Sequence, residues 1–239
     1  MKIVQFTDIH IGAKGENTRN VDVRENLKSI LKAIAGEEAD MVVLTGDLCF
    51  NEPLNNTYKW IIKQLNKRGI DPFVIPGNHD NSVMLAHHFD MPLIDSEVYF
   101  KHEVNGTCIL FLDTAIGKMS PAQWAWLENH VHSAHKLVIF MHHPPVHANV
   151  PFMDGTHAFE EQEKFQELLA QRQDTVEIFC GHYHVDKSIS LRNIHVHITP
   201  SCFFQIRDDI KDFGVDHYRI GYRVIEMSNG LISHSVRYL

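Results

Sequence analysis

The stretch VIPGNHDNS, residues 74 to 82, joins the end of an apolar strand to a Pro-Gly turn and then to Asn78, His79 and Asp80. Pro and Gly explain the turn, because they end a strand and let the chain change direction. They give no reason for a histidine at position 79. A chemical role for this histidine becomes the better explanation if matching polar groups follow other strands.

The residues before this stretch alternate between strand and helix patterns. KIVQFT, DMVVLTG and PFVIPG are short apolar runs, which predict strands. Residues 21–35 carry apolar side chains at helical spacing and end at Gly36, and residues 55–68 read as a second helix before Gly69. This strand–helix–strand–helix–strand order predicts a layered α/β core with parallel strand pairs.

The second half of the chain is richer in strand signals. Asn105-Gly106 and Asn229-Gly230 each predict a hairpin turn, and Ser120 followed by Pro121 predicts a helix start. KLVIFMHH and VEIFCGHYH predict buried strands, residues 158–171 a helix, and the last fifty residues successive strands. We therefore expect one domain, residues 1–239, of the α/β (α+β layered) class. Its predicted form is a four-layer αββα sandwich of two mixed β-sheets flanked by helices.

Composition restricts the class of protein. The formal net charge is -8 and no basic block is present, which argues against binding to duplex nucleic acid. The four cysteines are scattered without a C-x-x-C pair, as expected of reduced thiols in a cytoplasmic protein. No apolar run approaches the ~20 residues of a membrane span, and the first residues read as a strand rather than a signal peptide.

Polar residues of the metal-binding type follow several of the predicted strands. They are Asp8, His10, Asp47, Asn78, His79, His142, His182 and His184. Ligands of layered α/β folds bind beyond the carboxyl ends of strands, so these distant residues can converge. Asp8 and His10 form an i, i+2 pair, whose members point the same way in an extended backbone. Glycine before Asp47, Asn78 and His182 lets the backbone pass close to a bound group.

The ligand types indicate the kind of metal centre. Imidazole and carboxylate suit Mn, Fe, Co or Zn, and the set needs no thiolate. It is too large for one tetrahedral ion but suits two ions that share a carboxylate, an arrangement known for displacement at phosphorus. The ligands do not identify which of these metals is bound.

The ordered blocks DIH, GD, GNHD, HH and GHYH resemble the calcineurin-like metallophosphoesterase superfamily. FMHHPP at 140–145, IFCGHYH at 178–184 and TPSCFFQ at 199–205 are similar to the bacterial class III cyclic-nucleotide phosphodiesterases and their glycerophosphodiesterase relatives. The resemblance implies that one metal is held by Asp8, His10, Asp47 and His184. It implies that the second is held by Asp47, Asn78, His142 and His182, with Asp47 bridging the two.

The resemblance also implies a phosphodiesterase that acts on a small anionic phosphodiester, with a 3′,5′-cyclic nucleotide such as cyclic AMP as the first expectation. Two cations lower the pKa of a bridging water, which attacks phosphorus, and His79 donates a proton to the leaving group. A glycerophosphodiesterase, a 2′,3′-cyclic nucleotide phosphodiesterase and a phosphomonoesterase are the alternatives within the superfamily. A protein-binding scaffold without activity is the alternative outside enzymes.

Several residues keep two interpretations. Asp80 either orients the His79 imidazole or caps the following helix. His143, His147, His157, His195 and His197 are expected to be structural or surface residues, although loop 146–157 could overhang the site. Asn17, Arg19 and Asn20 lie in loop 12–20, which either contacts the substrate or is a mobile polar loop. Histidines 87, 88, 130, 132 and 135 are expected on solvated helix faces, Trp126 is a candidate interface residue, and a homodimer stays open.

Overall fold

The computed structural model describes residues 1–134, 136–228 and 230–239. Its first sheet has the strand order β13 (Leu231–Tyr238), β12 (Gly221–Ser228), β1 (Lys2–Phe6), β2 (Met41–Thr45) and β3 (Phe73–Ile75). β1, β2 and β3 are parallel to one another, whereas β12 and β13 join the sheet antiparallel. The predicted parallel pairing of the first three strands is confirmed.

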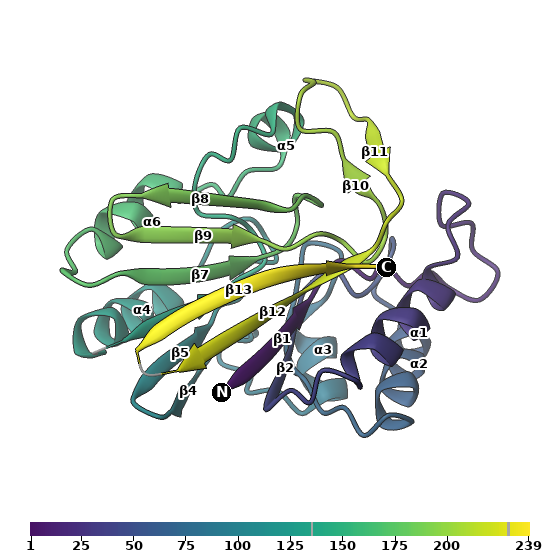
Figure 1. Cartoon of the computed structure of the whole chain (residues 1–239), viewed down its shortest axis with the longest axis horizontal. Helices are drawn as coiled ribbons and strands as arrows, with labels where there is room; N and C mark the ends of the chain where they lie inside the picture. Colours follow the sequence, from purple (N-terminus) through teal and green to yellow (C-terminus); the bar gives the residue numbers. More distant parts are fainter. Residues whose placement is uncertain (135, 229) are drawn as a thin grey trace.

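The second sheet is also mixed. Its strand order is β4 (Phe100–Val104), β5 (Thr107–Phe111), β6 (Leu137–Phe140), β7 (Val176–Cys180), β9 (Ile194–Ile198) and β8 (Lys187–Leu191). β5, β6, β7 and β9 are parallel, and the two outer strands pair antiparallel. A separate pair of short strands, β10 (Gln205–Ile206) and β11 (Val215–His217), stands above the sheets in Figure 1.

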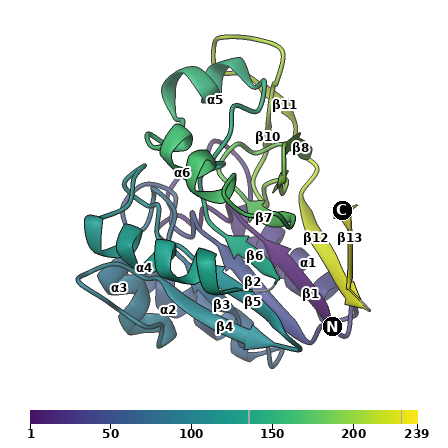
Figure 2. The same cartoon turned by 90° about the vertical axis from the view of Figure 1, so that its left-hand side faces the viewer.

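The two sheets pack face to face with helices outside, as the predicted αββα sandwich requires. Figures 1 and 2 show α1 (Val23–Ile34), α2 (Asn55–Asn66) and α3 (Ser82–Phe89) beside the first sheet, and α4 (Pro121–Ser133) and α6 (Gln162–Leu169) beside the second. The interface between the sheets contains polar bridges as well as apolar side chains. Gln5 of β1 donates to the Cys180 carbonyl of β7 at 3.1 Å, and Arg223 of β12 donates to the Ile198 carbonyl of β9 at 2.8 Å.

The helices begin where capping side chains satisfy free backbone N–H groups. Asp22 accepts from Glu25 N at the start of α1, and Ser120 accepts from Gln123 N at the start of α4, which confirms the predicted cap. The apolar stripe of α4, which includes Trp124 and Leu127, is buried. Trp126 is half-buried, and its ring meets that of Tyr99 at a centroid distance of 5.1 Å.

Two boundaries differ from the sequence-based expectations. The helix predicted for residues 158–171 begins only at Gln162, because the preceding residues contact another loop: Glu160 N donates to Gly117 O, and the Glu161 carboxylate accepts from Met119 N and Trp124 Nε1. The segment treated as a loop contains a short helix, α5 (Pro151–Thr156). The Asp154 carboxylate stabilises its start by accepting from Ala148 N and Val150 N.

The remaining local predictions are mostly confirmed. Asn105 and Gly106 both have positive φ and connect β4 to β5, as a tight hairpin demands. All four cysteines are buried and free. Residue 229 of the second predicted turn and His135 lie outside the described residues. Across the part of the chain that is described, no helix has both the length and the apolar character needed to cross a membrane.

Candidate metal centre

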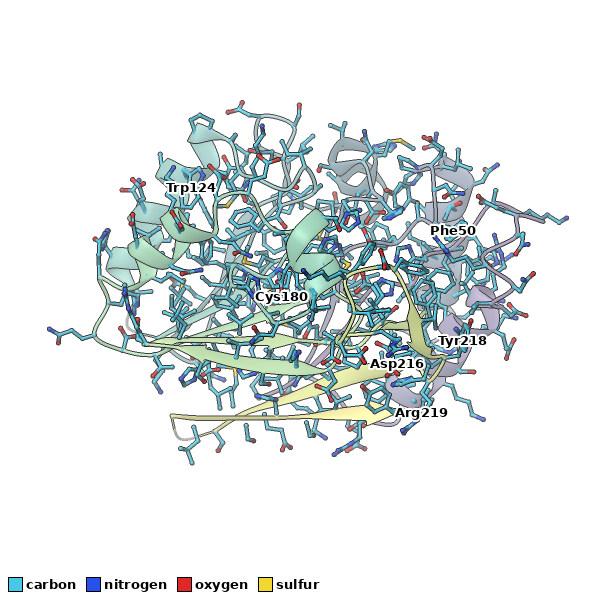
Figure 3. All side chains as sticks on the ribbon, turned by 90° about the horizontal axis from the view of Figure 1, so that it is seen from above. Phe50, Trp124, Cys180, Asp216, Tyr218 and Arg219 are labelled. Carbon is cyan, nitrogen blue, oxygen red and sulfur yellow. The ribbon has the colours of Figure 1, made fainter. Side chains whose placement is uncertain are left out.

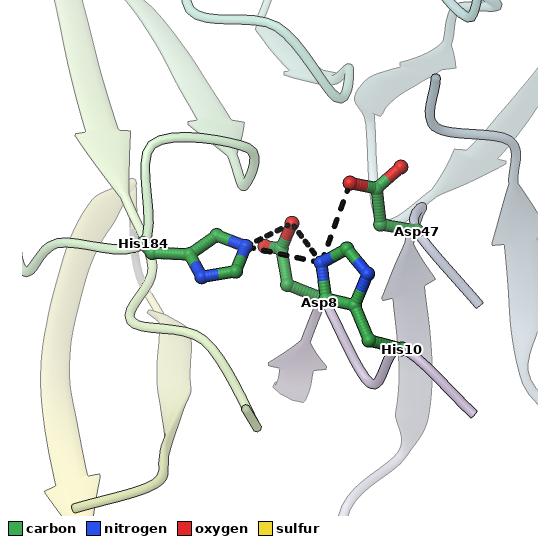
Figure 4. A group of neighbouring side chains, drawn as sticks. All are labelled: Asp8, His10, Asp47 and His184. Carbon is green, nitrogen blue, oxygen red and sulfur yellow. Dashed lines mark hydrogen bonds and ion pairs between the residues drawn. The ribbon is translucent and has the colours of Figure 1, made fainter. Parts of the chain in front are cut away.

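The structure brings the predicted metal-binding residues together in two adjoining groups. Within each group the potential ligand atoms lie within 4.8 Å of one another, and every residue is buried. The first group is Asp8, His10, Asp47 and His184, and the second is Asp47, His142 and His182. Figure 4 shows the first group converging from separate segments of the chain, with Asp8 and His10 on one segment and Asp47 and His184 on two others. Asp47 belongs to both groups.

Parallel strands position these residues at the facing edges of the two sheets. Asp8 and Asp47 follow the neighbouring strands β1 and β2, and His142 and His182 follow the neighbouring strands β6 and β7. The loops then bond across the gap between the sheets. His182 N, after β7 of the second sheet, donates to Asp8 Oδ2, after β1 of the first, at 3.1 Å. Within the second sheet, Gly181 N donates to the His142 carbonyl at 3.1 Å.

The backbone at the candidate ligands corrects one part of the sequence-based argument. Asp8 (φ 53°), His10 (φ 42°) and Asp47 (φ 53°) have left-handed rather than extended conformations, and so do His182 (φ 68°) and His184 (φ 51°). Asp8 and His10 therefore converge because the backbone coils after β1, not because alternate side chains of an extended strand point the same way. Non-glycine residues in this region are uncommon and concentrate at functional sites, where the surrounding structure holds them.

Glycines allow the loops to approach one another. Gly46 has φ +95°, and a Cβ there would lie 2.5 Å from His142 Nδ1. A Cβ at Gly77 would overlap Asp47 Oδ1 and the Asp47 backbone nitrogen, and would lie 2.8 Å from His142 Cε1. Close packing of the two metal-binding groups thus depends on the absence of a side chain at these positions.

Gly77→Ala is therefore expected to displace Asp47 and to lower both metal content and thermal stability, because the overlap is with backbone and cannot be relieved by a rotamer change. The overpacking alone is expected to cost about 1–3 kcal/mol of unfolding free energy. Metal analysis and thermal melts of the purified protein measure both effects. Gly155→Ala, where a Cβ meets nothing within 4 Å, is the matched control. Equal metal content in the two variants would contradict the expectation.

Backbone carbonyls fix the tautomer of three of the histidines. His142 Nδ1 bonds the Thr45 carbonyl at 2.7 Å and His184 Nδ1 bonds the Phe204 carbonyl at 2.9 Å. His182 Nε2 bonds the His157 carbonyl at 2.9 Å. Because a carbonyl only accepts, each of these nitrogens carries the proton. The lone pair is left on Nε2 of His142 and His184 and on Nδ1 of His182, as in metal-binding histidines.

An unsatisfied atom shows that the centre fits a cation. Among the described residues, buried His142 Nε2 has no hydrogen-bond partner, although Asp47 Oδ1 is 3.3 Å away. His10 Nε2 similarly lies 3.5 Å from Asp47 Oδ2 and 3.1 Å from His184 Nε2. Two lone pairs aimed at shared carboxylates at these distances suit a positive ion between them, so the donor set and its arrangement fit divalent metals.

The electrostatics of the metal-free protein agree with this arrangement. Burial lowers the pKa of His10 to about 3, and burial together with His142 lowers the pKa of His182 to about 3, so both rings are neutral and able to bind metal. Burial opposes charge on Asp47, but the adjacent His142 outweighs it and holds the Asp47 pKa well below its usual range. For His142, the Asp47 charge outweighs burial and raises the pKa to about 9, so this ring carries a proton in the metal-free protein and would release it to bind a metal.

Asn78 and His79 lie at the opening of the centre. Both line the cavity above the metal-binding groups, Asn78 is exposed, and His79 is half-buried. His79 N donates to Asp47 Oδ1 at 2.9 Å, and the His79 ring meets the edge of the His10 ring at a centroid distance of 4.9 Å. The His79 imidazole therefore faces the space where a substrate would enter.

Neither predicted role of Asp80 matches its contacts. The capping residue of α3 is Asn81, whose side chain accepts from Met84 N. Both Asp80 oxygens are used elsewhere: they accept from Leu48 N at 3.0 Å, Gly77 N at 3.0 Å and Tyr58 Oη at 3.1 Å. Asp80 thus ties the loop after β2 to the turn after β3, and among the described residues no bond joins it to the His79 ring.

The other histidines separate into structural and cavity-lining residues. His143 is buried and bonds Thr114 Oγ1 at 3.0 Å, and His195 and His197 both bond the Glu177 carboxylate. His147 is exposed, as expected, but His157 lines the cavity and orients His182 through its carbonyl. The sequence did not distinguish these two residues, because α5 was not predicted. Of the described helix histidines, His87 and His132 are exposed, whereas His88 and His130 are half-buried.

A cavity of about 440 Å³ opens above the two metal-binding groups, within the usual size range of small-molecule sites. Its floor includes His10, Asp47, His182 and His184. One wall is largely aromatic and contains Phe152, Phe204 and Phe213. Phe204 belongs to the TPSCFFQ stretch, whereas no sequence motif indicated Phe152 or Phe213. The cavity therefore combines a polar floor for an anionic group with an apolar wall.

The sequence model of the family described as "Calcineurin-like phosphoesterase" matches residues 1–186. The chain belongs to the calcineurin-like phosphoesterases. A Fibrobacter succinogenes protein named "Probable cyclic nucleotide phosphodiesterase" is 30% identical over 239 residues, which covers 99% of this chain and 93% of that protein. The protein named "3′,5′-cyclic adenosine monophosphate phosphodiesterase CpdA" of Vibrio vulnificus is 25% identical over 252 residues, covering 100% of this chain and 90% of that one.

A solved structure shares the fold of this calcineurin-like phosphoesterase. The dimetal phosphatase from Danio rerio superposes with a TM-score of 0.74 at 11% identity, covering 100% of this chain and 96% of that one. The family and its phosphodiesterase-named relatives make the chain a metal-dependent phosphoric ester hydrolase. The two groups of candidate ligands are consistent with the dinuclear metal centre of that family.

Proposed function

We propose that this protein is a 3′,5′-cyclic nucleotide phosphodiesterase. The observation that carries the proposal is the pair of buried metal-binding groups that share Asp47 on the floor of one cavity. The substrate class is supported by the names of relatives that align over nearly the whole chain. A protein-binding scaffold would not need buried histidines that converge on a shared carboxylate, as His10 and His142 do on Asp47.

The proposed ligands fall into two sets. Asp8, His10, Asp47 and His184 would hold one ion, and Asp47, Asn78, His142 and His182 would hold the second. Two metal ions bound there activate water and neutralise charge on the phosphoryl group. The identity of the metals is proposed only as Mn, Fe, Co or Zn, because imidazole and carboxylate serve all of them.

The side chains around the metals have separate tasks in this proposal. The carbonyls of Thr45, Phe204 and His157 hold three ligand rings in the metal-binding tautomer. His79 is anchored through its backbone to Asp47 and stands at the cavity opening, where its imidazole donates a proton to the leaving alkoxide. Asp80 acts indirectly, because it joins the loops that carry Asp47 and Asn78.

A substrate panel tests the proposal. Chelated protein is expected to be inactive, and reloading with Mn²⁺ is expected to restore turnover of 3′,5′-cyclic AMP at a higher kcat/KM than that of 2′,3′-cyclic AMP, glycerophosphoethanolamine or an aryl phosphomonoester. A bis-aryl phosphodiester reports the metal chemistry without nucleotide selectivity. Turnover of the aryl diester with little activity on cyclic AMP would support the phosphoric ester hydrolase activity but reject the cyclic nucleotide as its substrate. Metal binding without turnover of any ester would favour the scaffold.

We also propose that residues 1–239 work as one domain in the cytoplasm. Four buried, free thiols suit a reducing compartment, where disulfides do not persist. Strands from both ends of the chain support the same sheet, since β1 pairs with β12. Limited proteolysis that released a stable, metal-binding fragment would contradict the single domain.

A further inference from the structure

The aromatic wall of the cavity comes from two parts of the chain, α5 and the segments that flank β10 and β11. Phe152 belongs to α5, Phe204 precedes β10, and Phe213 precedes β11. Their rings contact one another: Phe152 and Phe213 are 5.7 Å apart in an edge-to-face arrangement, and Phe204 and Phe213 are 5.9 Å apart. These segments thus build a continuous aromatic surface next to the metal centre.

The exposure of these rings separates core packing from a binding surface. Phe204 is only 4% exposed and packs against the His184 ring at a centroid distance of 5.2 Å, whereas Phe213 is 40% exposed and Phe152 is half-buried. A phenyl ring that stays exposed inside a concave site contributes little to folding. Its unburied area is available to an apolar or aromatic part of a ligand.

Arg19 completes this surface. Its guanidinium carbon lies 4.8 Å from the Phe213 ring centroid and 6.0 Å from that of Phe204, and Arg19 also lines the cavity. A guanidinium is planar and stacks on aromatic faces, which an ammonium group does not. We name Arg19, Phe152 and Phe213 the aromatic rim of the cavity.

The loop that carries Arg19 is held in place. Thr18 Oγ1 donates to Val21 O at 2.6 Å, Asn17 Oδ1 accepts from Asn20 N at 2.7 Å, and Asn51 of the cavity donates to Glu16 Oε1 at 2.6 Å. These bonds connect the loop to itself and, through Glu16, to Asn51. They support Arg19 in a left-handed conformation, with φ 52°.

The chemistry of the aromatic rim selects one kind of ester group. A glycerol moiety would place its hydroxyls against phenyl rings without partners, which is unfavourable. A planar heteroaromatic ring would instead stack on phenyl and guanidinium faces. Every nucleobase can make this interaction, because every base has a π-face. Resting on the proposed phosphodiesterase function, we propose that Arg19, Phe152 and Phe213 bind the nucleobase of the substrate while the metal centre holds its phosphate.

The test compares two substrates with the same reacting ring. 3′,5′-Cyclic AMP and the cyclic phosphate of 1,3-propanediol share a six-membered cyclic diester, but only the first has a base. Phe213→Ala is expected to lower kcat/KM for cyclic AMP about tenfold, the size of one base–aromatic stack, and to leave the propanediol ester unchanged. Tyr218→Ala is the matched control, because Tyr218 is 61% exposed, lies beside β11 in Figure 3 and does not line the cavity.

A binding measurement accompanies the kinetics. Calorimetry on the metal-loaded protein is expected to show that Phe213→Ala weakens binding of adenosine 5′-monophosphate but not of ribose 5-phosphate. Arg19→Lys, which keeps the charge and removes the planar group, is expected to weaken the nucleotide in the same way. Unchanged nucleotide binding in Arg19→Lys would overturn the stacking role of Arg19.

The outcomes separate this inference from the proposed function. A wild-type protein that cleaves the aryl diester but neither cyclic ester would contradict the cyclic-nucleotide assignment. A wild-type protein that prefers cyclic AMP, and whose Phe213→Ala and Phe152→Ala variants keep the full preference, would contradict only the nucleobase site. An equal loss for both cyclic esters would show general damage to the cavity and would also overturn the inference.

Discussion

Asp47→Asn is expected to remove both metal ions from the protein at once. Asp47 contacts His10 through Oδ2 at 3.5 Å and His142 through Oδ1 at 3.3 Å, so its two oxygens face the two ligand groups. The amide keeps the volume but loses the charge and one of the two oxygens. Residues that merely orient a ligand change metal affinity by about 10–100-fold, so a bridging ligand is expected to exceed that effect.

Metal analysis by mass spectrometry after dialysis measures the ions that remain per chain, and turnover of the aryl diester is expected to fall with them. Asp113→Asn is the matched control. Asp113 is equally buried and accepts from Val98 N and Ala115 N, but it belongs to neither ligand group. Loss of only one metal from Asp47→Asn would show that Asp47 does not bridge, and would require the two ligand sets to be redrawn.

His79→Ala is expected to lower turnover about 10²–10⁴-fold while both metals stay bound, because it removes a proton donor and no proposed ligand. The backbone bond from residue 79 to Asp47 Oδ1 does not depend on the side chain, so the loop is expected to keep its place. The loss is expected to be largest for cyclic AMP, whose leaving alkoxide needs a proton. It is expected to be smallest for a 4-nitrophenyl diester, whose leaving group is stable as an anion.

Metal analysis, kcat for the two esters and the pH–rate profile together test this role. A proton donor gives the wild-type profile a basic limb, which is expected to disappear in His79→Ala. The exposed His87, on α3, is the control position for a histidine-to-alanine change. Loss of metal from His79→Ala, or an equal loss for both esters, would mean that His79 is a ligand or a structural residue instead.

The aromatic rim and the metal centre differ in how they could be inferred. Asp8, Asp47 and His182 each follow an apolar run in the sequence, so their position at a strand end was predictable. Phe152 and Phe213 have no such signal, because a phenylalanine outside a motif looks the same in sequence whether it packs in the core or lines a cavity. Only the meeting of α5 with the segments before β10 and β11 distinguishes the two.

Asp80 shows why neighbours in sequence are a poor guide to contacts. Its position after His79 suggested a bond to that imidazole, and its position before α3 suggested a cap. The turn after β3 instead directs its carboxylate toward Leu48 N, Gly77 N and the Tyr58 hydroxyl, which need an acceptor when buried. The need of these three donors for an acceptor therefore sets the direction of the Asp80 carboxylate, and the neighbouring His79 ring does not.

The sequence by itself determined the layers, the Ser120 cap of α4 and the residue types of the candidate ligands, because these depend on short-range patterns of apolar residues, turns and capping side chains. Tertiary structure alone decided the left-handed backbone at Asp8 and Asp47 and the tautomers of the ligand histidines. Those tautomers depend on carbonyls from distant segments, such as Thr45 for His142. A proton on imidazole goes to whichever nitrogen meets an acceptor, and only the packing of the two sheets brings that acceptor into reach.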